Sequence, residues 1–310
     1  MESKNNIVVA GSLNADLVQR VERFPRPGET VVGSDLSIIP GGKGANQACA
    51  AALLGGRVKM LGQVGNDPFG PILIESLERA NVDTSGVRVS AAATGTAAIL
   101  VLPAGENLII ISPGANANLT PDTITDRLET IGPRSILLTQ LEVPLATTEL
   151  CLRVARERGA TTILDPAPAQ ALPSELLALV DFLTPNQTEA ALLLGSKGEI
   201  ESYEEAEQAA QELLERGPSA IVLKLGSLGV VVAKRGAAFR AHGFAVKAVD
   251  STAAGDTFNG ALAVALAEGS TLEDACRFAN AAGAISVTRH GAQSSIPRRT
   301  EVEDFLRTRA

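Results

Sequence analysis

Short apolar runs alternate with segments of helical spacing through the second part of the chain. Residues 135–142 (SILLTQLE) and 161–168 (TTILDPAP) are typical of buried strands, and residues 145–159 between them repeat apolar positions every three or four residues. The same alternation continues with a helical pattern at 204–217 and an apolar run at 220–226. Strand-helix-strand alternation predicts a parallel sheet covered by helices.

The first 115 residues follow a different pattern. Residues 7–12 (IVVAGS) form a continuous apolar run, which predicts a buried strand. Residues 16–40 and 95–114 instead alternate apolar and polar positions, as half-exposed antiparallel strands do, and residues 104–107 (AGEN) suit a hairpin turn. We therefore expect a small sheet that lies as a lid over one edge of the core.

The chain shows no internal repeat, low-complexity tract or Gly/Ser-rich linker. We therefore predict one domain over residues 1–310, an α/β core into which lid segments at about 13–41 and 94–113 are inserted. A sheet with one apolar face and no helices of its own needs cover, from substrate or from another subunit. This need predicts a homodimer formed through the lid.

Composition narrows the classes of function. With 27 basic and 35 acidic residues the net charge is −8, and no Lys/Arg cluster offers a footprint for nucleic acid or membrane. The three cysteines, Cys49, Cys151 and Cys276, lie far apart in apolar helical patterns, which predicts reduced thiols in the core. The chain has two histidines and no Cys/His cluster, so zinc sites and His-based triads are disfavoured. Carboxylates and oxygen ligands must carry any chemistry.

Neither a signal peptide nor a membrane span is expected from the sequence. The apolar run near the N-terminus is too short for the core of a signal peptide, and no stretch reaches the ~20 apolar residues of a spanning helix. We expect a cytoplasmic protein.

Two carboxylates flank a turn of small residues. Asp250 and Asp256 lie on either side of the sequence STAAG, and an apolar, Ala-rich helical pattern follows. An acid at the start of a helix can cap it, because its oxygens accept hydrogen bonds from N–H groups that lack partners within the helix. The same N–H groups can instead hold an anion beside Asp256 acting as a base. The stretch alone fits either function.

A glycine-rich stretch at residues 38–56 places glycines around Lys43, with Asn46 following as a helix begins. Glycine lets the backbone approach a ligand closely, but a plain turn before a helix has the same composition. The stretch is not a Walker A loop, because Gly44 and not Ser or Thr follows the lysine. No G-x-G-x-x-G follows the first strand either, which removes the main support for a Rossmann dehydrogenase.

Polar residues also follow the predicted strands. Asn14 and Asp16 come after the first strand and could bind hydroxyl groups or simply cap a turn, and Glu142 ends the strand at 135–142. Asn186 and Glu189 stand three apart at a helix start, which fits a capping box and also fits a hydrated Mg²⁺.

Eight segments together resemble the ribokinase branch of the phosphofructokinase-B-type sugar kinases over essentially the whole chain. They are GGKGANQA, DSTAAGDTFNG, NADLV, TQLE, DPAPA, TPNQTEA, KLGSLGV and TRHGAQSSIP. The resemblance implies a three-layer α/β/α core with a mainly parallel sheet and a small β-sheet lid. It also implies ATP-dependent phosphorylation of a sugar, with D-ribose at its 5-hydroxyl as the leading candidate.

The resemblance further implies roles for individual residues. Asp256 would be the general base, and the backbone N–H groups of Ala253, Ala254 and Gly255 would form the anion hole. The implied sugar ligands are Asn14, Asp16, Gly42, Lys43, Asn46, Glu142 and Asp256. The implied nucleotide ligands are Asn186, Lys224, Gly226, Ser227, Gly229, Gly255 and Asn280, with Glu189 acting on Mg²⁺ through water. The implied K⁺ site comprises Asp250, Thr252, Ser286, Arg289, Gly291 and Ser295.

The chain departs from the family pattern at Gln187, where an acid is common, at Asn280, where His is frequent, and at His290, where Lys is frequent. These departures leave nucleotide preference and metal affinity open. The alternatives are a kinase of 2-deoxyribose, a nucleoside or another small sugar, and a non-catalytic sugar-binding regulator. An aromatic content of 3% gives little material for stacking a nucleoside base.

Overall fold

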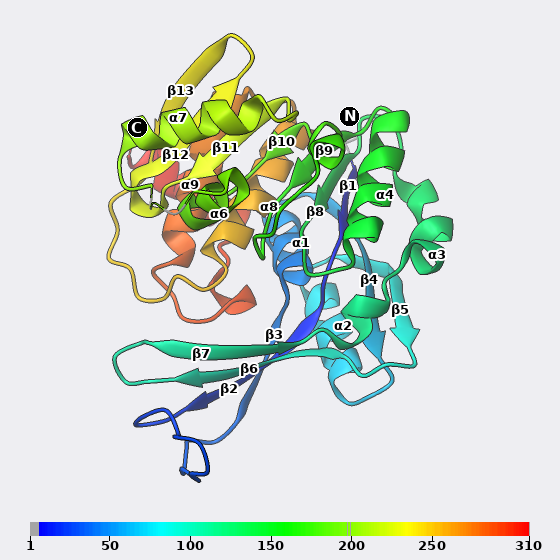
Figure 1. Ribbon diagram of the computed structural model, residues 1–310, viewed down its shortest axis with the longest axis vertical. Coiled ribbons are helices and arrows are strands. Elements are labelled where there is room, and N and C mark those ends of the chain that lie inside the picture. Colours follow the sequence, from blue (N-terminus) through cyan, green and yellow to red (C-terminus); the bar gives the residue numbers. More distant parts are fainter. Residues whose placement is uncertain (1–5, 197, 199, 310) are drawn as a thin grey trace.

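A computed structural model describes residues 6–196, 198 and 200–309 of the chain. Its centre is a twisted sheet that has nine strands among these residues (Figure 1). In sheet order the strands are β13 (Ala237–His242), β12 (Gly229–Lys234), β11 (Ala220–Lys224), β10 (Phe182–Leu183), β9 (Thr161–Leu164), β8 (Ile136–Thr139), β1 (Asn6–Ala10), β4 (Arg57–Gly65) and β5 (Asp83–Ser90). Neighbours from β11 to β5 are parallel, and β12 and β13 add an antiparallel edge.

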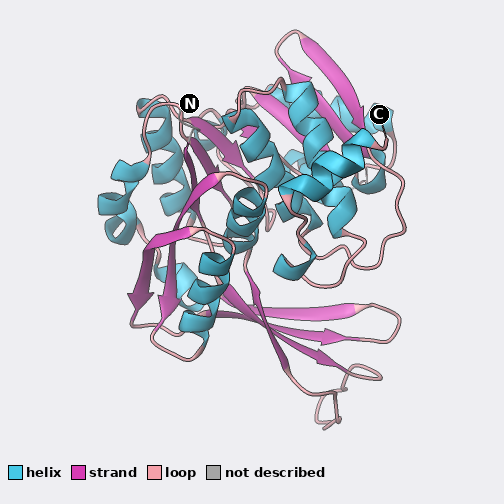
Figure 2. Ribbon diagram, turned by 180° about the vertical axis from the view of Figure 1, so that it is seen from behind, coloured by secondary structure: helices cyan, strands magenta, loops and turns pink. Residues whose placement is uncertain are grey.

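Helices cover both faces of this sheet, which gives three layers (Figure 2). One face is covered by α1 (Lys43–Leu53), α2 (Phe69–Arg79), α8 (Ala254–Ala267), α9 (Leu272–Ser286) and α10 (Arg299–Arg307). The other is covered by α3 (Pro121–Ile124), α4 (Leu145–Glu157), α5 (Ser174–Leu177), α6 (Gln187–Leu194) and α7 (Tyr203–Leu214). Short 3-10 turns are η1 (Gly114–Asn118), η2 (Thr125–Thr130), η3 (Gly226–Leu228) and η4 (Gln293–Ser295). The predicted three-layer α/β/α class is confirmed.

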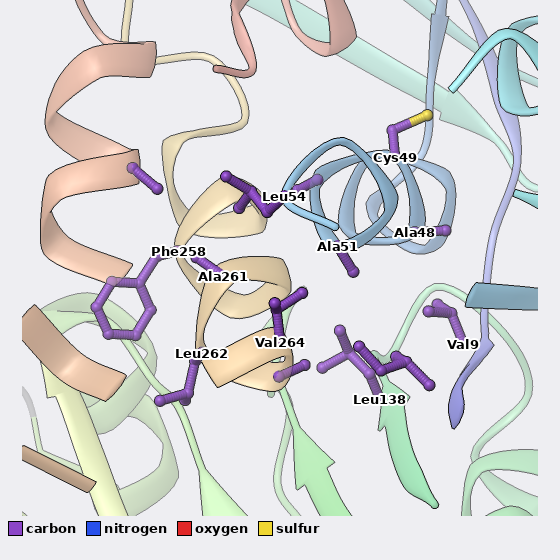
Figure 3. Close-up of a cluster of buried hydrophobic side chains, with 14 of the residues drawn as sticks. Val9, Ala48, Cys49, Ala51, Leu54, Leu138, Phe258, Ala261, Leu262 and Val264 are labelled. Carbon is purple, nitrogen blue, oxygen red and sulfur yellow. The ribbon is translucent and has the colours of Figure 1, made fainter. Parts of the chain in front are cut away.

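Helices α1 and α8 pack closely because small residues line their contact. A Cβ added at Gly260 of α8 would lie 2.6 Å from the Cβ of Ala50, which is too close for any side chain. Around this contact Leu54, Phe258 and Val264 fill the core (Figure 3). The close packing brings the first turns of both helices, and their polar residues, to the same place.

The small sheet extends away from the core as the predicted lid (Figure 1). Its order is β3 (Ser37–Gly41), β2 (Asn14–Arg20), β6 (Gly95–Val101) and β7 (Asn107–Ser112). The predicted hairpin forms, with Leu102 N–H donating to Glu106 O at 2.9 Å. Antiparallel pairing holds for β2 with β3 and for β6 with β7, but β2 and β6 are parallel, which differs from the expectation.

Three further details differ from the sequence prediction. Residues 16–40 form strands only at their two ends, since no strand spans residues 21–36. Asn14 and Asp16 lie within β2 rather than in a loop after β1, and Glu142 lies three residues beyond the end of β8.

The three cysteines are free and buried, as predicted. Within the described residues, no helix is both long enough and apolar enough to cross a membrane.

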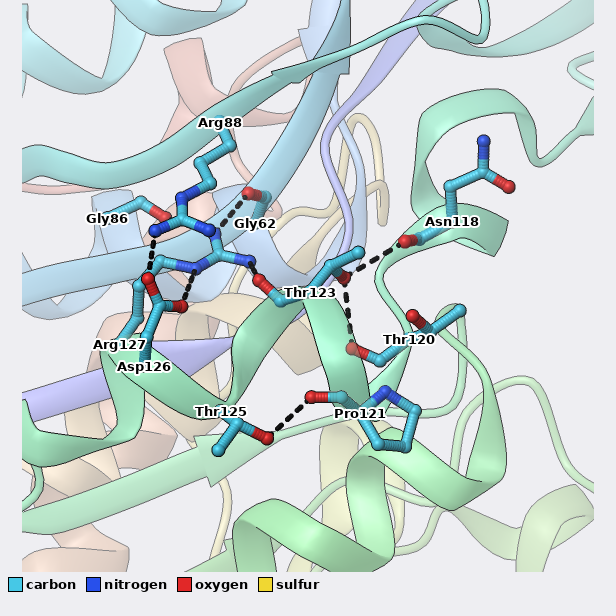
Figure 4. Close-up of polar contacts among 10 residues, drawn as sticks. All are labelled: Gly62, Gly86, Arg88, Asn118, Thr120, Pro121, Thr123, Thr125, Asp126 and Arg127. Atoms are coloured by element: carbon cyan, nitrogen blue, oxygen red, sulfur yellow. Dashed lines mark hydrogen bonds and ion pairs between the residues drawn. The ribbon is translucent and has the colours of Figure 1, made fainter.

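Arg127 connects the segment of α3 and η2 to the edge of the large sheet (Figure 4). Its guanidinium donates to the carbonyl oxygens of Gly62 and Gly86 at 3.0 and 2.6 Å and also to that of Thr123. A buried arginine that donates to three backbone carbonyls has a structural function here, because it connects α3 with β4 and β5.

Candidate active site

Asp256 lies in the first turn of α8 and is buried where α8 meets α1, near the carboxyl ends of the parallel strands. Asn46 Nδ2 donates to one of its carboxylate oxygens at 3.0 Å, and Gln47 Nε2 donates to the other at 2.9 Å. Burial raises the pKa of Asp256 to about 6, against the opposing charge of Lys43 and these two hydrogen bonds. The carboxylate is therefore ionised at neutral pH and can still take up a proton.

The residue before α8 has an unusual backbone. Ala253 is in the left-handed region with φ 58°, which costs about 1–2 kcal/mol for a residue with a Cβ. Such strain is found at functional sites, where the surrounding structure enforces it. Ala254 N–H donates to Ser251 O at 3.2 Å, while the N–H groups of Ala253 and Gly255 have no hydrogen-bond partner among the described residues. The helix mouth thus has free donors for an anion, although Ala254 is less available than predicted.

Asn14 and Glu142 line a cavity of about 400 Å³ between the lid and the core. Asn14 Oδ1 accepts a hydrogen bond from Asn116 Nδ2 at 2.7 Å, which fixes the orientation of the Asn14 amide. Glu142 Oε2 accepts from Ser12 Oγ at 2.5 Å and from Lys43 N–H at 3.0 Å. Groups with fixed donors and acceptors in a concave site suit a ligand rich in hydroxyls.

The glycine-rich stretch leaves space for the Asp16 carboxylate and leads directly into α1. A Cβ at Gly41 would lie 2.3 Å from Asp16 Oδ2, so glycine is what leaves room for that carboxylate. Gly42 has φ 88°, which favours glycine, and precedes α1 directly. Burial, followed by the negative charges of Glu142 and Asp256, raises the pKa of Asp16 to about 7.

Lys43 is the cation among these acids. Burial alone would lower the pKa of its ammonium, but the charges of Asp256, Asp165, Glu142 and Glu189 outweigh it, so the pKa is raised. Lys43 lines the next cavity, of about 440 Å³, together with Asp256. It therefore stands where the predicted sugar and phosphate sites meet.

Two adjoining cavities contain the predicted nucleotide ligands. The cavity with Lys43 also has Asn186, Glu189 and the helix mouth on its walls, and a more apolar one of about 500 Å³ has Ser227, Gly229 and Asn280. The residues common to both cavities are Lys224, Gly226, Ser251, Ala254 and Gly255. A polar cavity joined to an apolar one suits a ligand with a charged and an aromatic end.

Asn186 and Glu189 form the predicted capping box at the start of α6. Asn186 Oδ1 accepts from Glu189 N–H and Glu189 Oε2 accepts from Asn186 N–H, each at 2.8 Å. Burial first, and then the charge of Asp165, raise the pKa of Glu189. The capping function is therefore present, and Glu189 also lines the polar cavity. Asn280 also connects α9 to β13, because its Nδ2 donates to Ala241 O at 2.9 Å.

Asp250 connects the two loops of the predicted K⁺ site. Its carboxylate accepts from Thr252 N–H and Gly291 N–H, both at 2.9 Å, which holds residues 250–252 against the loop that follows α9. Burial alone would raise the pKa of Asp250, but these hydrogen bonds outweigh it and lower the pKa. Arg289 forms an ion pair with Glu301, while the hydroxyls of Ser286 and Ser295 donate to backbone carbonyls.

Three buried residues of the site were not assigned a function from the sequence. Asp165 directly follows β9 and forms an ion pair with Lys224 Nζ at 3.0 Å. Gln47 bridges Asp165 and Asp256, and Gln140 donates to Gln47 at 2.6 Å. An acid directly after a parallel strand could have been noticed, since that edge of the sheet is where ligands bind. The glutamines give no comparable signal.

Comparison with known proteins agrees with this geometry. A model of the pfkB family of carbohydrate kinases matches residues 4–299. A ribokinase of Haemophilus influenzae is 42% identical over 98% of this chain and 99% of its own length. A crystal structure of ribokinase from Thermotoga maritima matches with a TM-score of 0.89 and 42% identity, over 98% of this chain and 99% of that one. The structure of Arabidopsis thaliana ribokinase complexed with ribose and ATP matches with a TM-score of 0.91 and 35% identity, over 97% and 98%. The chain therefore belongs to the pfkB family of carbohydrate kinases.

Proposed function

We propose that this protein transfers the γ-phosphoryl group of ATP to the 5-hydroxyl of D-ribose, producing ribose 5-phosphate and ADP. One observation carries the proposal: Asp256 lines the polar one of the two adjoining nucleotide cavities, together with Lys43. The backbone N–H of Lys43 donates to Glu142, which lines the cavity with Asn14 between the lid and the core. The ribokinase relatives, one of them described with ribose and ATP, support this choice of substrates.

In the proposed reaction Asp256 accepts the proton of the 5-hydroxyl as that oxygen bonds to the γ-phosphorus. The bond from the γ-phosphorus to the oxygen of the leaving ADP breaks in the same step. The free N–H groups of Ala253 and Gly255 stabilise the charge on the transferring group, and Lys43 supplies a cation beside it. Phosphoryl transfer depends on such positioning and charge more than on covalent chemistry.

The donors in the polar cavity also fit Mg²⁺. Glu189 and Asp165 both line it, and Mg²⁺ prefers one or two carboxylates together with waters and phosphates. We propose that Glu189 acts on Mg²⁺ through water, and that the ion would supply charge neutralisation for the phosphates. For K⁺ we propose the two loops joined by Asp250, whose carboxylate provides the negative charge.

Free buried thiols and the use of ATP support a cytoplasmic location.

The direct test is ADP release from ATP and Mg²⁺ with D-ribose, 2-deoxyribose, fructose and adenosine, each in K⁺ and in Na⁺. We expect ribose to be the fastest acceptor and K⁺ to support faster turnover than Na⁺. Turnover on another acceptor alone would reject ribose while keeping the sugar kinase, and sugar binding without ADP release would favour a regulator. Equal rates in both salts would reject the K⁺ site.

We also propose a homodimer in which a second copy covers the outer face of the lid. The register places Ile110, Ala98, Leu17 and Ile38 in one row across the four strands, on the face opposite to that of Asp16. Ile110 is 61% exposed, which is unusual for a large apolar side chain flanked by others. Because the lid forms a wall of the sugar cavity, a partner that supports it would also support the site.

Replacing Ile110 by aspartate is therefore expected to convert the dimer into a monomer at micromolar concentration, measured by sedimentation velocity. A charge buried at the centre of an apolar interface costs several kcal/mol, enough to weaken association by about a hundredfold or more. Val89→Asp is the matched control, because Val89 is 63% exposed on β5, away from the lid. A wild-type protein that sediments only as a monomer would reject the dimer.

A further inference from the structure

Gln47 is a fully buried residue of α1 that the proposed reaction does not use. Its Nε2 atom donates to Asp165 Oδ2 at 2.8 Å and to Asp256 Oδ1 at 2.9 Å. An amide nitrogen carries two hydrogens, so a single NH₂ group supplies one donor to each carboxylate. Asp165 directly follows β9 and Asp256 lies in the first turn of α8, and both accept a hydrogen bond from this one nitrogen.

A second glutamine fixes the orientation of the first. Ionised carboxylates only accept hydrogen bonds, so the NH₂ group of Gln47 must face them and its carbonyl must face away. That carbonyl accepts from Gln140 Nε2 at 2.6 Å. A Cβ at Gly11 would lie 2.1 Å from Gln140 Oε1, so the space for this chain of amides depends on glycine at the end of β1.

We propose that Gln47 is a positioning residue, which holds the Asp256 carboxylate oriented and ionised next to a second carboxylate. The inference rests on the proposed function, in which Asp256 is the base. Bound substrate does not need to touch Gln47 for this effect, because the residue acts through Asp256.

The charges around Asp256 show why such a residue is needed. Lys43 favours the ionised form, whereas Asp165 disfavours it, and Asp16 is a further nearby acid whose own pKa responds to Asp256. Asp165 is itself paired with Lys224. Without the shared NH₂ group, the carboxylate of Asp256 would lose one of its two side-chain donors while the like charge stayed in place. Its protonated form would then be favoured.

The test is the substitution Gln47→Met, which keeps an unbranched side chain of similar size and removes the donor. In protein labelled with ¹³C at the aspartate side-chain carboxyls, the Asp256 resonance is identified by its absence in Asp256→Asn, and its titration is followed. We expect the midpoint to rise by about one pH unit, because a hydrogen bond to a charged group stabilises the ionised form by about that much free energy. The acid limb of kcat/KM for sugar should move with it, giving a loss of about fivefold at pH 6 that approaches tenfold at lower pH and diminishes as the pH rises.

Gln63→Met is the matched control. Gln63 is a buried glutamine on β4 whose amide nitrogen, suitably oriented, donates to the carbonyl oxygens of Ala115 and Asn118 at 3.2 Å. Both variants lose buried hydrogen bonds and stability, but only Gln47→Met should move the Asp256 titration. Gln140→Met, which releases the Gln47 carbonyl, should move it in the same direction by a smaller amount.

Unchanged midpoints in Gln47→Met and Gln140→Met, or an equal shift in Gln63→Met, would overturn the inference. Failure of the proposed function looks different: the wild type would phosphorylate no sugar, while the carboxylate titration would still report whether Gln47 holds Asp256. A purely structural function for Gln47 would lower the melting temperature and leave both pH profiles in place.

Discussion

Replacement of Asp256 by asparagine is expected to lower kcat for sugar phosphorylation by about 10²- to 10⁴-fold, the usual contribution of a positioned general base. The substitution keeps the shape of the side chain between Asn46 and Gln47 but removes the group that accepts the proton. Sugar affinity, measured by calorimetry, should change little, because the cavity walls at Asn14 and Glu142 are untouched.

The pH dependence provides a second readout of this prediction. Because Asp256 must be ionised to act as a base, wild-type activity should fall as the pH drops through about 6, the raised pKa of this carboxyl. The residual activity of the variant should lack that limb. Asp274→Asn, at an exposed acid in the first turn of α9, is the control and should keep the wild-type rate. Comparable turnover in Asp256→Asn would remove the base assignment.

The core could be predicted from the sequence because its pattern is local. Each parallel strand is buried on both faces and shows as a continuous apolar run, and each covering helix shows its own spacing. The lid was predicted less completely. The parallel pairing of β2 with β6 joins segments about 80 residues apart, and alternation within a strand does not specify its neighbour.

The site shows the same division between local and distant information. Two short motifs could be recognised in the sequence: Asp256 after its turn of small residues, and Asn186 with Glu189 at a helix start. Asn186 and Glu189 form the capping box and also line the polar cavity, so the two expected functions are compatible. Gln47 was invisible, because its partner Asp165 is 118 residues away and an amide within an Ala-rich helix has no pattern of its own. Residues that act through other residues are therefore the ones that single-sequence reasoning misses.

The second large effect is expected from Gly255→Leu, which should raise KM for ATP by about a hundredfold, the upper range for forcing atoms into an occupied space. Gly255 lies where the polar and the apolar nucleotide cavities join. A Cβ there meets nothing nearer than Lys224 Nζ at 3.6 Å, so the fold leaves room for a side chain to begin at this position. Its remaining atoms would fill the passage that the nucleotide has to span.

The sugar cavity does not include Gly255, so calorimetric binding of ribose and the melting temperature should both stay near the wild-type values. Gly132→Leu adds the same side chain where a Cβ would contact only Ser135 Oγ at 3.9 Å, outside the nucleotide cavities, and serves as the control. A Gly255→Leu protein that is stable and keeps the wild-type KM for ATP would show that the phosphates do not pass this helix mouth. The anion hole at Ala253 and Gly255 would then have to be abandoned, because a phosphoryl group held there cannot avoid the atoms of the new side chain.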